Sequence, residues 1–167
     1  MSPHASDSRI ASGEYALAIY MAITLLGIIA AASWKNLFAD YGELVVLIIG
    51  GTITVTVAHA WATVSAHRLA HQRALTSSER REELRGACAL LAVGLFAIVT
   101  LTVSHTVTDN LGESVLLTLL VLVAVLFAVG VVGARLSGKG WWRSLGWGLI
   151  DASIGFAVLV VKVVFGS

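Results

Sequence analysis

The chain has 167 residues, of which 57% are hydrophobic and only 13% are charged, with a formal net charge of +1. A soluble domain carries about 25% charged residues, so this composition is typical of a membrane protein. The small net charge gives no reason to expect a nucleic-acid partner. The single cysteine, Cys88, excludes a disulfide within the chain and a cysteine-rich zinc site.

Five long apolar stretches predict an all-α integral membrane protein. Each is close to the ~20 residues that a helix needs to cross the hydrocarbon core of a bilayer. Residues 1–13 are polar and unpatterned, and we expect them to form a disordered cytoplasmic segment before a single five-helix transmembrane domain, 14–167. The predicted helices cover about residues 15–34, 44–69, 78–107, 114–134 and 145–165.

The basic residues predict which connections lie in the cytoplasm. Arg and Lys mark cytoplasmic loops, whereas the opposite side of the membrane carries few of them. Arg and Lys gather in the second and fourth connections, namely Arg68, Arg73, Arg80, Arg81 and Arg85, then Arg135, Lys139 and Arg143. We therefore expect a cytoplasmic N-terminus, a C-terminus outside, and a multi-pass protein of a cell membrane, which the small size and short loops suggest is the bacterial cytoplasmic one.

The second predicted helix carries a polar stripe at membrane depth. Thr52, Thr56, His59, Thr63 and His67 recur every three or four residues and so share one face. Beside them run Ala58, Ala62, Ala66 and Ala70, a small-residue pattern that permits close helix approach. Two interpretations stay open: an ion or solute path, because ionisable groups in membranes are commonly functional, or a structural helix whose threonines bond to their own backbone.

Two further polar groups bear on this path. Asp151, near the start of the last helix, either pairs with a nearby arginine or faces the second helix and joins His59. His105 lies near the far end of the third helix, ~15 Å from the depth of His59, so the two cannot share one haem iron. The fourth helix has almost no polar side chain, and we expect it to pack peripherally against lipid.

No motif indicates an enzyme or a resident cofactor. There is no Glu-x-x-His pair, no phosphate-binding glycine loop and no nucleophile elbow. A capping box is expected where Thr76 is followed by Glu79, so the third helix should begin in the charged second connection. Most of that charge run is expected to be a solvated face.

Three segments resemble the vacuolar iron transporter (VIT) family. They are residues 57–68 (VAHAWATVSAHR), residues 78–84 (SERREEL) and residues 133–145 (GARLSGKGWWRSL). The resemblance implies a VIT-like bundle, a homodimer, and a transport path between the first and second helices. The family's metal ligands are an acid in the first helix and a Met and a Glu in the second; here Tyr20, Met21, Thr56 and Ala60 stand near those places.

Because oxygen ligands from carboxylates suit divalent iron, the resemblance implies a retained scaffold without its metal ligands. We therefore expect a transporter of a small cation or a proton-coupled solute, with Thr52, Thr56, His59, Thr63 and Asp151 along the path and the identity of any metal unknown. The alternative is a non-transporting scaffold or accessory subunit on the same fold.

Overall fold

Five long helices account for nearly all of the described backbone in the computed structural model. They are α1 (Pro3–Trp34), α2 (Tyr41–His71), α3 (Ser77–Thr108), α4 (Leu111–Leu136) and α5 (Trp141–Phe165). The structure describes the backbone of residues 3–35, 37–71 and 75–165, and the side chains of residues 13–33, 35, 37–70 and 75–160. All five helices are long and apolar enough to cross a membrane.

The helices extend further than the apolar stretches do. The predicted helix over 78–107 is confirmed as α3, and it begins at the expected capping box: Glu79 N–H donates to Thr76 Oγ1, and Thr76 N–H donates to Glu79 Oε2. The backbone of residues 3–13 is helical, where we expected disorder. Pro3 stands at the first helical position, where its fixed φ angle favours helix initiation.

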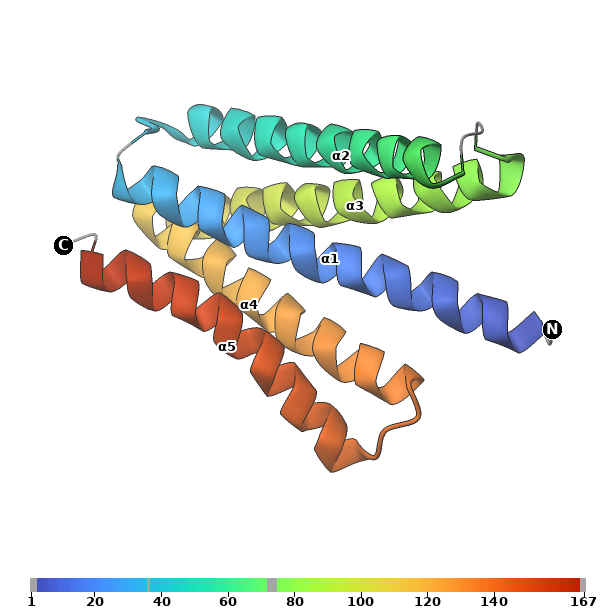
Figure 1. The fold of residues 1–167 in the computed structure, drawn as a ribbon. Helices are drawn as coiled ribbons and strands as arrows, with labels where there is room; N and C mark the ends of the chain where they lie inside the picture. Colours follow the sequence, from blue (N-terminus) through green and yellow to red (C-terminus); the bar gives the residue numbers. More distant parts are fainter. Residues whose placement is uncertain (1–2, 36, 72–74, 166–167) are drawn as a thin grey trace.

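The helices form two antiparallel hairpins around a central one. The α2–α3 pair and the α4–α5 pair lie on either side of α1, which packs against all four other helices (Figure 1). The start of α1 and the end of α5 lie at opposite ends of the bundle, as five crossings require. Which end faces the cytoplasm stays a prediction.

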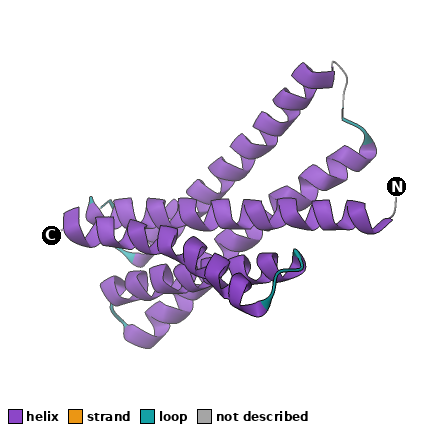
Figure 2. Ribbon diagram, turned by 60° about the horizontal axis from the view of Figure 1, so that its bottom comes forward, coloured by secondary structure: helices purple, strands orange, loops and turns teal. Residues whose placement is uncertain are grey.

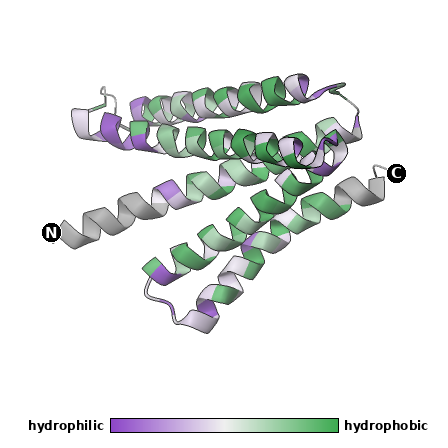
Figure 3. Cartoon of the chain, turned by 180° about the vertical axis from the view of Figure 1, so that it is seen from behind, coloured by the Kyte–Doolittle hydropathy of each residue, from purple (hydrophilic) through white to green (hydrophobic). Residues whose placement is uncertain are grey.

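The hairpins are not equally embedded in the bundle. Figure 2 shows the connected ends of α2 and α3 projecting away from the other helices. Figure 3 shows hydrophilic residues at these ends, whereas the middle of each helix is largely hydrophobic. The extra turns of α2 and α3 therefore carry the charged connection beyond the apolar part of the molecule.

The core lies where α1, α3 and α4 meet. Its largest side chains include Met21, Leu25 and Leu26 of α1, Leu90 and Leu101 of α3, and Leu119, Leu122 and Leu126 of α4, all fully buried. The expectation that the fourth helix is peripheral is wrong, because α4 packs against α1, α3 and α5. A helix that is apolar on every face gives no sequence signal that separates a protein-facing side from a lipid-facing one.

Glycines let α4 and α5 approach closely. A methyl group at Gly130 of α4 would overlap the carboxylate of Asp151 and would lie 3.0 Å from the Cα atom of Gly148. A methyl group at Gly148 would in turn overlap Val131. Small residues at such contacts allow the backbone-to-backbone packing that holds membrane helices together.

Candidate functional site

The polar stripe of α2 lies against α3, and its threonines bond to their own helix. Thr52 Oγ1 donates to the Ile48 carbonyl at 2.7 Å, and Thr56 Oγ1 donates to the Thr52 carbonyl at 2.8 Å. Thr63 makes the same bond to the His59 carbonyl at 3.1 Å. These bonds match the structural interpretation of the threonines, since each hydroxyl already donates its proton to the backbone.

Thr52 also sets the distance between the two helices. Its side chain is buried, and it rests directly on Gly94 of α3, where a methyl group would overlap it. A residue with a side chain at position 94 would push α2 and α3 apart. At Thr52 the polar stripe therefore packs against α3.

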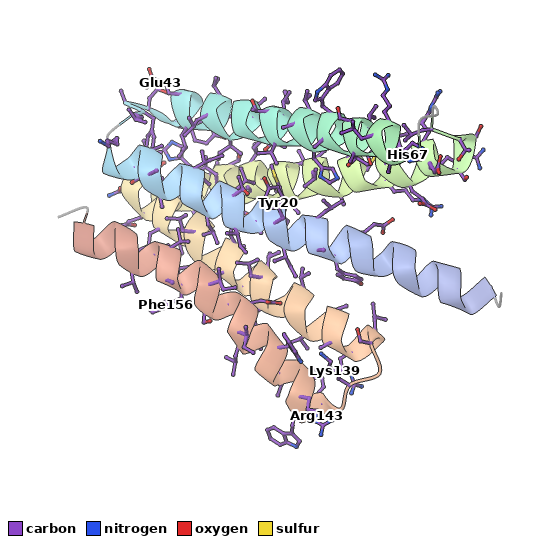
Figure 4. All side chains as sticks on the ribbon, viewed as in Figure 1. Tyr20, Glu43, His67, Lys139, Arg143 and Phe156 are labelled. Atoms are coloured by element: carbon purple, nitrogen blue, oxygen red, sulfur yellow. The ribbon has the colours of Figure 1, made fainter. Side chains whose placement is uncertain are left out.

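The histidines of α2 differ from the threonines, because each faces a carboxylate of α3. His59 Nε2 lies 3.9 Å from Glu83 Oε1, and His67 Nε2 lies 3.6 Å from Glu79 Oε2. Figure 4 shows His67 in the space between the two helices. An imidazole and a carboxylate therefore oppose each other twice across this seam, which we call the His–Glu seam and define by these four residues.

The inner pair of the seam, His59 and Glu83, contains a buried carboxylate oxygen. Glu83 Oε1 is buried and accepts no hydrogen bond, and the side chains of His59 and Glu83 are only 29% and 17% exposed. At 3.9 Å the two groups attract as an ion pair when the imidazole is protonated, but they are too far apart for a direct hydrogen bond. Glu83 thus presents a buried carboxylate oxygen to the imidazole ring of His59.

The outer pair of the seam, His67 and Glu79, also takes part in the cap at the start of α3. Glu79 Oε2 accepts hydrogen bonds from Thr76 N–H and Thr76 Oγ1 at 2.7 and 2.8 Å while it faces His67. The same carboxylate therefore completes the helix cap and meets α2. The capping box ties the start of α3 to the end of α2.

Glu79 and Glu83 were not among the expected site residues. They lie in the charged run that we expected to be a solvated face. A signal was available for Glu79, because residues at similar distances from the turn of an antiparallel hairpin stand opposite each other. Glu79 lies near the start of α3 and His67 near the end of α2. The same count does not pair Glu83 with His59, because His59 lies further from the connection than Glu83 does.

Asp151 is not brought to the seam. Its carboxylate lies over Gly130, inside the α4–α5 hairpin, and α5 packs chiefly against α4 and α1. His105 is also separate: its ring stacks on Tyr41 at 4.9 Å, at the end of the bundle opposite the α2–α3 connection. Of the residues expected along a path, the structure brings the threonines and His59 together on α2 and leaves Asp151 apart.

The seam consists of pairs and not of a larger ligand group. Among the residues that the structure describes, no three or more His, Cys, Asp or Glu side chains gather as a metal-ion site would require. The chain matches no family model, no curated protein and no solved structure.

Proposed function

We propose that the chain is a multi-pass membrane transporter on a VIT-like, homodimeric scaffold, and that the species it moves through the α2–α3 seam is the proton. The carrying observation is the His59–Glu83 pair, in which a buried carboxylate oxygen without a hydrogen bond lies 3.9 Å from an imidazole nitrogen. Ionisable side chains between membrane helices are commonly functional, since burying a charged group there is costly.

The two His–Glu pairs lie one after the other along the helices, which supports a proton path in that direction. His67 and Glu79 lie near the connected ends, where hydrophilic residues gather (Figure 3), and His59 and Glu83 lie further along the seam. His59 stands eight residues from His67, ~12 Å along α2. Glu79 and Glu83 are one helical turn, ~6 Å, apart on α3, so a proton would pass from the outer pair to the inner pair along α3.

The transport test uses proteoliposomes with a trapped pH-sensitive dye. Wild-type protein should collapse an imposed pH gradient faster than empty vesicles do, and His59→Gln and Glu83→Gln should each lower that rate at least tenfold. Matched controls are His105→Gln and Glu113→Gln, a stacked histidine and an exposed carboxylate away from the seam. Wild-type rates equal to those of empty vesicles, or manganese uptake without proton flux, would contradict the proposal.

A second function is favoured by a different observation. The hydroxyls of Thr52, Thr56 and Thr63 are all bonded to their own helix, as in a purely structural element. The exposed Ala58, Ala62 and Ala66 offer a flat face for another helix. A scaffold or accessory subunit would co-purify with a partner protein through α2 and would leave the pH gradient intact.

A further inference from the structure

One arginine from each of two helices lines a pocket at the α2–α3 connection. The pocket has a volume of about 250 Å³ and is lined by Val64 and Arg68 of α2, Leu75, and Arg80 and Glu83 of α3. The guanidinium groups come from different helices, so an anion between them would bridge the hairpin. A guanidinium group binds phosphate oxygens in a bidentate manner, which makes paired arginines a typical phosphate site.

An apolar groove continues along the same two helices. Its volume is about 420 Å³, and eight of its nine lining residues are apolar: Ile49, Ile53, Cys88, Leu91, Ala92, Gly94, Leu95 and Ile98, with Thr52 at its floor. Ile53, Leu91 and Leu95 are exposed there. Because this part of α2 and α3 is long and apolar enough to span a membrane, the groove opens toward hydrocarbon.

The pocket and the groove lie on one side of the hairpin. Ile53 and Val64 stand eleven residues apart on α2, and Arg80 and Leu91 stand eleven apart on α3. Eleven residues are close to three full turns, so both pairs return to the same face, ~16 Å along the axis. That distance matches the ~15 Å thickness of hydrocarbon in one leaflet.

We propose that this face binds one phospholipid, with its phosphodiester between Arg68 and Arg80 and one acyl chain in the groove. The formal charges fit: two arginines and one glutamate sum to one positive charge, which a single phosphodiester neutralises. Free phosphate would leave the groove unfilled. The bound lipid would tie the protruding end of α2 to α3, and it would share Glu83 with the seam.

The test is native mass spectrometry of delipidated protein titrated with phosphatidylglycerol. We expect one lipid per chain, and binding at least tenfold weaker for the Arg68→Gln/Arg80→Gln variant. The matched control, Arg135→Gln/Arg143→Gln, removes two arginines from the other basic connection and should bind within twofold of wild type. Equal affinity of the first variant and wild type would overturn the proposal.

Further experiments test the acyl chain and the phosphate of the lipid separately. Ala92→Phe fills the groove from an exposed position and should also weaken binding at least tenfold, whereas unchanged binding would overturn the acyl-chain assignment. Diacylglycerol, which lacks the phosphate, should bind at least tenfold more weakly than phosphatidylglycerol. Displacement of the lipid by millimolar inorganic phosphate would show an anion site only and would equally overturn the proposal.

Discussion

His59 of α2 and Glu83 of α3 face each other at 3.9 Å across the seam between two helices that are long and apolar enough to span a membrane. The relationship predicts an energetic coupling that a double-mutant cycle can measure. His59→Gln and Glu83→Gln together should cost less stability than the sum of the two single variants, with a coupling of about 0.5–1 kcal/mol. Thermal unfolding in detergent at pH 6 measures the stability of the wild type, the two single variants and the double variant.

The same coupling should shrink at high salt. Salt screens the attraction between charged groups, whereas packing contacts do not depend on it. His105 and Glu113, which do not face each other across the seam, provide the control cycle and should give additive effects at low and high salt. Equal coupling at both salt concentrations would mean that the pair is held by packing and not by charge.

Gly130 should tolerate no larger residue. Gly130→Val would place carbon atoms where the Asp151 carboxylate and the Gly148 backbone lie, which would separate α4 from α5. Overpacking of this kind costs about 1–3 kcal/mol, visible as a lower thermal midpoint in detergent. Gly133→Val is the matched control on the same helix, because nothing lies within 4 Å of a methyl group there. Equal midpoints for the two variants would rule out close α4–α5 packing at Gly130.

Gly94 should depend on Thr52 across the α2–α3 seam. Gly94→Ala would overlap the Thr52 side chain and lower the thermal midpoint. Thr52→Ala removes the hydroxyl and the methyl group that would overlap, so the double variant should recover part of the loss. A double variant as unstable as the sum of both singles would contradict the contact.

Asp109 ends α3 in a left-handed conformation. Its φ angle is 50° and its N–H donates to the His105 carbonyl. Asn tolerates this conformation about as well as Asp, whereas a β-branched residue does not. Asp109→Val should therefore lower stability by about 1–2 kcal/mol, and Asp109→Asn should leave it unchanged. Thermal midpoints that rank the two variants in the opposite order would refute this cap.

The helices were predictable because each rests on a local property of the sequence. Apolar stretches of sufficient length give α1 to α5, and Thr76 with Glu79 gives the start of α3. The neighbours of each helix were not predictable, since hydrocarbon and protein interior select the same side chains. The packing of α4 against three other helices was missed for this reason, and so was the position of Asp151 over Gly130.

The candidate site was half predictable from the sequence. His59 stands out as an ionisable residue in an apolar helix, and the stripe of threonines lies on the same face of α2. Glu83 does not stand out, because a carboxylate among arginines is typical of a solvated surface. Only the pairing of α2 with α3 separates Glu83 from its charged neighbours.

Accessibility labelling in intact cells tests the membrane architecture on which the transport and lipid proposals both depend. In a Cys88→Ala background, single cysteines at Arg80, Asp109 and Lys139 report on the second, third and fourth connections. Five crossings place successive connections on alternating sides, and the basic residues place the second and fourth in the cytoplasm. A membrane-impermeant thiol reagent should therefore label Asp109→Cys from outside, and label Arg80→Cys and Lys139→Cys only after the membrane is opened. Labelling of Arg80→Cys and Asp109→Cys from the same side would contradict the five-crossing architecture.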